Sequence, residues 1–128
     1  MRFLIDTHVF LWWLGDSGKL SDLSRKMIRN RDNEIFFSLA SVWEIAIKIS
    51  LGKLTLALPL DRFMTEQLAH NGFHLLPLDF RHVTRVETLP FHHRDPFDRL
   101  LVAQSLEENL PLITADTVVE QYQVMRIW

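Results

Sequence analysis

With 128 residues, of which 48% are hydrophobic, the chain is long enough to fold as one domain around a sizeable core. Its formal net charge of -2 provides no overall attraction to nucleic acid, so any such contact depends on a local basic patch. The chain has no cysteine, which excludes disulfides and thiolate metal sites, and no apolar run approaches the ~20 residues that cross a bilayer. We therefore expect a single domain over residues 1–128, without a membrane segment, in the cytoplasm.

Short apolar runs separated by helical patterns define the expected fold. Strands are predicted at residues 2–5, 34–38, 73–78, 112–114 and 124–128. Helices are predicted over 9–14, from 21, over 41–51, 61–71, 79–88 and 96–109, and from 116. This alternation predicts an α/β class protein with a central parallel sheet of about five strands and helices on both faces, a three-layer α/β/α arrangement.

The predicted helix at 96–109 opens with two acids. Asp95 is a suitable N-cap, because its side chain can accept a free backbone N–H, and Pro96 suits the first helical position. Asp98 then lies in the first turn, near the positive end of the helix dipole. Apolar residues follow on nearly every side, so this helix is expected to be buried.

Four acids are expected at the same edge of the sheet, beyond the carboxyl ends of the strands, where α/β proteins place their functional crevice. Asp6 follows the first strand, Asp116 follows the fourth, and Glu44 and Asp98 lie near helix starts. Each acid also has a structural interpretation: Glu44 can complete a capping box begun by Ser41, and Asp98 and Asp116 can stabilise helix N-termini.

Like charges gathered at one edge repel each other. At 4 Å and an effective dielectric of 20, each pair costs roughly 4 kcal/mol, more than the ~1 kcal/mol that a cap contributes. Protons, Arg or Lys side chains, or divalent cations must therefore neutralise them. Carboxylate oxygens without cysteine suit Mg²⁺ or Mn²⁺, and such clusters commonly activate water for attack on phosphate esters.

Five short blocks in this order resemble the PIN-domain family, and most closely its VapC-type toxin ribonucleases. The blocks are residues 4–8 (LIDTH), 41–48 (SVWEIAIK), 51–54 (LGKL), 92–101 (HHRDPFDRLL) and 114–116 (TAD). The resemblance covers essentially the whole chain and implies a PIN-like fold. It also implies a metal-dependent endoribonuclease that hydrolyses RNA phosphodiesters with an activated water and is restrained by a cognate antitoxin. Family members also suggest a homodimer.

Carried over position by position, the resemblance makes Asp6, Glu44 and Asp98 the main metal-binding and catalytic acids. Asp116 is the fourth, and Asp98, not Asp95, matches the core acid of the family. Asp95 is then the helix cap, with an auxiliary role open.

Further residues of these blocks are candidates for substrate or solvent contacts. Thr7 and Thr114 can bond a metal-bound water or a phosphate, although strand-end hydroxyls more often bond to backbone. The cations Arg94, Arg99 and Lys48 can hold RNA phosphates or, alternatively, can be ordinary solvated charges that pair with the acids.

Two other functions share the expected architecture. An aspartyl phosphatase needs a second acid two residues after Asp6, where this chain has His8. A receiver-like signalling module needs adjacent acids after the first strand and a late lysine, and no lysine follows Lys53. A catalytically silent RNA-binding module also remains open, and binding of RNA without turnover would favour it.

Overall fold

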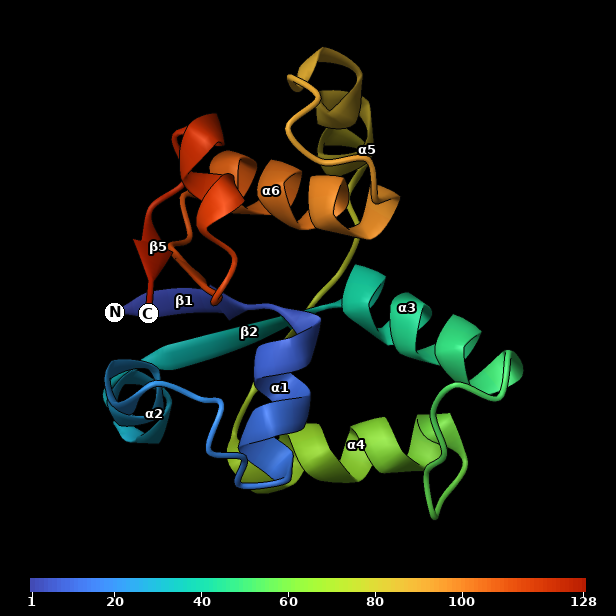
Figure 1. The fold of residues 1–128 in the computed structure, drawn as a ribbon. Coiled ribbons are helices and arrows are strands. Elements are labelled where there is room, and N and C mark those ends of the chain that lie inside the picture. The colour runs from blue at the N-terminus through green and yellow to red at the C-terminus, as the bar shows by residue number, and fades with distance from the viewer.

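A parallel sheet runs through the middle of the molecule, with its strands in the order β3-β2-β1-β4-β5 (Figure 1). The structure is a computed structural model that describes residues 1–128. The strands are β1 (Arg2–Ile5), β2 (Glu34–Ser38), β3 (His74–Leu76), β4 (Leu112–Ile113) and β5 (Arg126–Ile127). All four pairings are parallel, which confirms the predicted α/β class and the central sheet of five strands.

Helices cover both faces of this sheet. They are α1 (Thr7–Leu14), α2 (Asp22–Arg29), α3 (Leu39–Ser50), α4 (Leu60–Asn71), α5 (Phe80–Arg85) and α6 (Pro96–Glu108), with 3₁₀ turns η1 (Val86–Thr88) and η2 (Thr117–Tyr122). Figure 1 shows α1, α2 and α4 below the sheet and α5 and α6 above it, while α3 continues β2 past the sheet's edge. None of these helices combines the length and the apolar character that a bilayer crossing requires.

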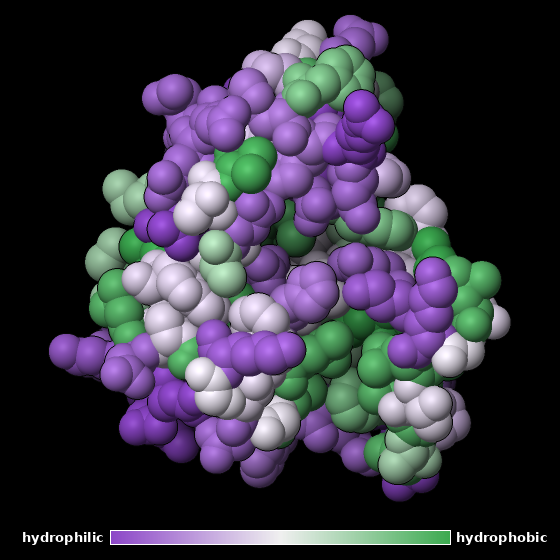
Figure 2. Space-filling model, in the orientation of Figure 1, coloured by the Kyte–Doolittle hydropathy of each residue, from purple (hydrophilic) through white to green (hydrophobic).

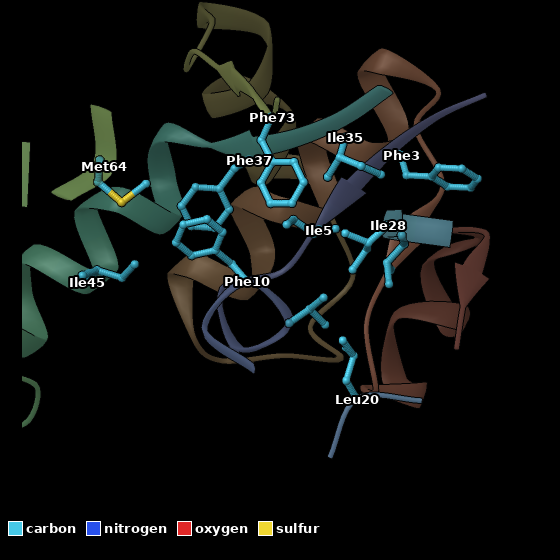
Figure 3. Packing of buried hydrophobic residues seen from close by; sticks show 12 residues of the cluster. Phe3, Ile5, Phe10, Leu20, Ile28, Ile35, Phe37, Ile45, Met64 and Phe73 are labelled. Atoms are coloured by element: carbon cyan, nitrogen blue, oxygen red, sulfur yellow. The ribbon is translucent and has the colours of Figure 1, made fainter. Parts of the chain in front are cut away.

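The core has two halves because successive side chains of a strand face opposite sides of the sheet. Phe3 and Ile5 of β1 belong to the cluster under α1, α2 and α4, whereas Leu4 between them belongs to the cluster under α6. In the first half, the rings of Phe10 and Phe37 stack with their centroids 4.0 Å apart (Figure 3). Strand β1 is thus buried on both faces, which explains its uninterrupted apolar sequence.

Several predicted boundaries are wrong, and two of them have a clear local cause. Helix α3 begins at Leu39, because the Ser38 hydroxyl caps it by accepting a hydrogen bond from the Ala40 N–H at 2.9 Å. The expected capping box from Ser41 to Glu44 therefore does not form, and Glu44 is free for other contacts. Strand β3 stops at Leu76 instead of residue 78, because Pro77 has no N–H to continue a ladder.

Hydrophobic surface gathers on one side of the molecule, between α1, α3 and α4 (Figure 2). Partly buried side chains of these elements, and of the 51–59 segment that joins α3 to α4, pack against the half of the core that contains Phe3 and Ile5. They include Leu11, Ile49, Leu54, Leu56 and Leu60. This surface lies on the opposite side of the sheet from α6.

Candidate active site

The carboxyl edge of the sheet brings together residues from the start, middle and end of the chain. Asp6 directly follows β1, and Thr114 directly follows the neighbouring strand β4. Asp98 lies in the first turn of α6, whose N-terminus faces the same edge, and Asp116 caps η2. The order β2-β1-β4 puts the central strand, and hence Asp6, in the middle of this set.

Asp6 is held by two donors. Its Oδ1 accepts the Val9 N–H at 2.7 Å, which makes Asp6 the N-cap of α1, and its Oδ2 accepts a short hydrogen bond from the Thr114 hydroxyl. Burial raises the pKa of the Asp6 carboxyl, although these two hydrogen bonds and the nearby His8 act in the opposite direction. Asp6 is therefore a fixed acid whose negative charge is poorly solvated.

The Thr114 hydroxyl links two of the acids. Besides donating to Asp6, its Oγ1 accepts the backbone N–H of Asp116 at 3.1 Å. Asp116 in turn accepts the Val118 N–H on Oδ1 at 2.9 Å, and its Oδ2 lies 2.6 Å from His93 Nε2. The hydroxyl thus bonds to an acid side chain and to backbone at the same time, whereas its contact with a metal-bound water or a phosphate stays a prediction.

Asp98 is the least constrained of the four acids. Its own carboxylate receives no hydrogen bond that affects its pKa, which burial and the charges of Asp95, Asp116 and Glu44 raise to about 6, against a smaller lowering by His93. Asp95 acts as the predicted cap of α6, since its Oδ1 accepts the N–H groups of Phe97 and Asp98 at 2.7 and 3.3 Å. No hydrogen bond stabilises the negative charge of Asp98, so a proton or a bound cation would have to neutralise it.

Glu44 stands slightly apart from the other three. Thr7 Oγ1 lies 2.7 Å from Glu44 Oε1 and 2.8 Å from the Ser41 hydroxyl. Because a carboxylate can only accept, Thr7 donates to Glu44 and accepts from Ser41. On its other side Glu44 pairs with Lys48, with 3.6 Å between Oε2 and Nζ, one helical turn along α3. Thr7 therefore positions Glu44, and Lys48 partly neutralises it.

A pocket of about 210 Å³ lies among the acids and is lined by Asp6, Asp98, Asp116 and Thr114, together with His8. Glu44 does not line it. A larger pocket of about 540 Å³ between α2 and α4 carries Arg29, Arg31 and His70 but no acid, so the smaller one has the chemistry of a catalytic site.

The donor set suits a hard divalent cation in kind, since the side chains around the pocket offer carboxylate and hydroxyl oxygens. No three histidine or acidic side chains, however, are grouped closely enough to hold a metal ion in this arrangement. Each of three acids is instead engaged by its own donor: Asp6 by Thr114, Asp116 by His93 and Glu44 by Thr7. A carboxylate oxygen that accepts one hydrogen bond keeps a lone pair for a cation, so one ion can bind several of these acids with the hydrogen bonds in place once the acids move closer together.

The predicted phosphate-binding cations have three different environments. Arg94 is exposed, and Lys48 is paired with Glu44. Arg99, in contrast, is only 5% exposed and donates to main-chain carbonyls of residues 86–93, so its assignment to RNA phosphates is wrong. The reason is its position one residue after Asp98, which turns its side chain away from the acids and under the loop that precedes α6.

Sequence reasoning missed two residues that contact the site. His93 was given no role in the sequence analysis, yet its side chain is only 9% exposed and bonds to both Asp116 and Tyr122. Tyr122 gave no sign of a role because it is 29 residues away from His93 in the sequence. The adjacent pair of histidines was the only available signal, and only one of the two, His93, turns inward.

Comparison with known proteins agrees with this fold and identifies the family. A model of the PIN domain matches residues 3–124, and the chain therefore belongs to the PIN domain family. A curated relative, Ribonuclease VapC22 of Mycobacterium tuberculosis, is 28% identical over 113 residues, which cover 88% of this chain and 85% of the relative.

Solved structures share the fold at low sequence identity. VapBC2 from Rickettsia felis, bound to a DNA fragment from its promoter, matches with a TM-score of 0.70 and 13% identity, covering 99% of this chain and 98% of that one. VapBC-1 from nontypeable Haemophilus influenzae matches with a TM-score of 0.62 and 14% identity over 99% and 97% of the two chains. VapBC-5 from Mycobacterium tuberculosis, a member of the VapBC family of toxin-antitoxin systems, matches with 0.60 and 19% over 98% of both.

Proposed function

We propose that this protein is a metal-dependent endoribonuclease and the toxin of a toxin–antitoxin pair. The observation that carries the proposal is the pocket that Asp6, Asp98 and Asp116 share at the carboxyl edge of a PIN domain. The ribonuclease name of the 28% identical relative supports RNA as the substrate, and the VapBC complexes that share the fold support an antitoxin partner.

Asp6, Glu44, Asp98 and Asp116 are the residues we assign to a bound Mg²⁺ or Mn²⁺. Such an ion supplies the positive charge that lowers the pKa of a water and stabilises a phosphate leaving group. The chain's own part is to orient the carboxylate oxygens through hydrogen bonds. Asp6 is oriented by Val9 and Thr114, and Glu44 by Thr7.

The raised pKa of Asp98, about 6, favours the same assignment. Perturbed carboxyls in a pocket mark functional sites more often than ordinary caps, because a cap needs no burial of its charge. A cation in the pocket would oppose the burial and the neighbouring charges that raise this pKa. Arg94, which is exposed in the loop before α6, is the predicted cation best placed to meet an RNA phosphate.

The partners belong to the same proposal. The hydrophobic surface between α1, α3 and α4 in Figure 2 is suited to a protein partner, since large exposed apolar surfaces usually serve as interfaces. A cognate antitoxin and a second copy of this chain are the protein partners in this proposal.

A cleavage assay tests the proposal directly. The purified protein is incubated with a mixed RNA substrate in Mg²⁺, in Mg²⁺ with excess EDTA, and as the variants Asp98→Asn and Asp61→Asn. Asp61 is a matched control, because it is an exposed aspartate in the first turn of a helix, α4, away from the pocket. We expect the wild type and Asp61→Asn to cut RNA in Mg²⁺.

EDTA and Asp98→Asn should each reduce cleavage by roughly 10³-fold or more, the scale of losing a key electrostatic group. Cleavage that survives EDTA would contradict the metal requirement, and full activity of Asp98→Asn would contradict the site. RNA binding without turnover in the wild type would instead favour a silent binding module.

A further inference from the structure

A nearly buried histidine, His93, contacts one of the acids that line the pocket without lining the pocket itself. His93 lies in the segment between η1 and α6, and its side chain is 9% exposed. It does not line the pocket, whereas Asp116, which it contacts at 2.6 Å, does. A substrate in the pocket would therefore meet Asp116 and not His93, so a role of His93 in catalysis has to pass through the carboxylate.

The hydrogen bonds around His93 fix the position of its ring proton. The backbone N–H of His93 donates to the Tyr122 hydroxyl at 2.7 Å, so that hydroxyl is an acceptor there. Its single hydrogen is then available for His93 Nδ1 at 3.0 Å. With Nδ1 accepting, the neutral ring carries its hydrogen on Nε2 and donates it to Asp116.

The ring itself is held in place by packing. His93 and Tyr122 stack with an interplanar angle of 8° and a centroid distance of 5.4 Å. His92, its neighbour, meets the same Tyr122 edge-on at 4.8 Å but is exposed and forms no hydrogen bond with an acid. Two adjacent histidines thus share an aromatic contact, and only His93 adds a donor to the site.

Arg99 fixes the backbone that carries His93. One end of its guanidinium, Nη1, donates to the carbonyl oxygens of Pro90 and His93 at 2.9 and 3.5 Å. The other end, Nη2, donates to those of Val86 and Leu89 at 3.0 and 3.1 Å. Because Arg99 follows Asp98 in α6, the segment that carries His93 is attached to the same helix that presents Asp98.

We propose that His93 is a positioning residue that holds Asp116 by a Nε2–H hydrogen bond, in an orientation that serves a metal ion in the pocket. The inference rests on the proposed metal-dependent function. Asp116 already gives Oδ1 to the Val118 N–H, and the bond from His93 fixes the second oxygen, so the carboxylate cannot rotate freely. Histidines and carboxylates paired outside the first coordination sphere typically change metal affinity or activity 10- to 100-fold when one is removed.

Metal affinity, measured by calorimetric titration of the purified full chain with Mn²⁺, tests this role with matched variants. His93→Phe keeps a ring on Tyr122 but has no donor, and His93→Gln has an amide N–H that can replace Nε2. We expect His93→Phe to weaken Mn²⁺ binding by about 10- to 100-fold and His93→Gln to retain most of the affinity. His92→Phe, the control, should bind Mn²⁺ as the wild type does.

Two outcomes would overturn the inference while leaving the proposed function intact. His93→Phe could bind Mn²⁺ as tightly as the wild type, or His93→Gln could be as weak as His93→Phe, which would show that ring packing and not donation matters. The thermal unfolding midpoint of each variant identifies any loss that is caused by unfolding.

A metal-free measurement separates this inference from the proposed function. In NMR spectra of the wild type without metal, the Nε2 proton of His93 should exchange slowly, and Asp116→Asn should shift or remove that signal. Without such a proton the inference fails on its own. A wild type that binds no Mn²⁺ but shows the proton overturns the metal assignment instead.

Discussion

The two sides of the acidic pocket are built differently. On the strand side, Asp6, Thr114 and Asp116 form a continuous chain of hydrogen bonds that begins at the end of β1 and finishes at η2. On the helix side, Asp98 stands in the first turn of α6 with neighbouring charges and no donor for its carboxylate. On the strand side, hydrogen bonds to the carboxylates hold the acids in place. On the helix side, only the position of Asp98 in α6 does so.

This difference suits the proposed site, which has to be rigid and also open to a cation. Donors on the strand side stabilise charged carboxylates before any ligand arrives, because hydrogen bonds to the charged form favour it. The unsatisfied Asp98 keeps part of the repulsion that a cation can relieve. Three variants sharpen the comparison.

The largest expected effect concerns the anchor of the helix side. Arg99→Met removes a buried guanidinium and leaves its main-chain carbonyl partners without a donor. We expect the free energy of unfolding to fall by about 3 kcal/mol, since stranded buried acceptors are costly. Urea denaturation measures the change, and Arg62→Met, an exposed arginine paired with Glu66, should change it by less than about 0.5 kcal/mol. Equal effects of the two variants would contradict an anchoring role for Arg99.

A smaller effect is expected on the strand side. Thr114→Val keeps the shape of the side chain but removes the hydroxyl that joins Asp6 to the Asp116 N–H. The protein should lose about 2 kcal/mol of unfolding free energy, and the pKa of Asp6 should rise further because a lowering hydrogen bond is gone. Thr114→Ser, which keeps the hydroxyl, should restore most of the stability in the same urea titration. A valine variant as stable as the wild type would contradict a contribution of the hydroxyl to stability.

The smallest effect has the opposite sign. Asp98→Asn removes a carboxyl whose pKa is raised from 3.8 to about 6 in the folded protein, so the charged form destabilises the fold. That difference corresponds to ~3 kcal/mol, and the partial exposure of Asp98 reduces the expected gain in stability to about 1 kcal/mol. A variant that is expected to lose cleavage should therefore be slightly more stable than the wild type.

The pH dependence of stability provides an independent check that Asp98→Asn stabilises the protein by removing a charge. Below the unfolded pKa both states of the wild type hold the proton on Asp98, so no penalty exists there. The penalty grows as pH rises through the folded value of about 6. Thermal unfolding of both proteins at about pH 4 and about pH 8 should show the advantage of Asp98→Asn only at the higher pH. An equal advantage at both values would mean that charge is not its cause.

The sequence was most informative where local chemistry determines structure. Asp95, Pro96 and Asn109 define the ends of α6 because caps and positive-φ positions depend on neighbours within a few residues. The apolar run at residues 2–5 predicts β1 because a strand buried on both faces has few alternatives. The same reasoning placed Asp6 after β1 and Asp116 after β4, and these two strands pair with each other in the sheet.

Contacts between distant segments were not predictable in this way. Arg99 looked like a free cation because its partners are carbonyl groups of a loop whose path no residue pattern encodes. Glu44 was expected to form a capping box with Ser41. Ser38 caps α3 instead, and Glu44 accepts a hydrogen bond from Thr7 of α1. His93 is the clearest case, since its burial depends on Tyr122 in η2. Whether the four acids act on a metal and RNA stays a prediction that the assays above test.

The bond between Asp6 and Thr114 joins residues 108 positions apart, and it has a consequence for synthesis. During translation Asp6 leaves the ribosome well before Thr114, which is added 108 residues later. Until then β1 lacks its neighbour on one side, and the pocket lacks one of its walls. The pocket thus cannot assemble on a nascent polypeptide that stops short of Asp116, which delays any activity it has until that residue has been added.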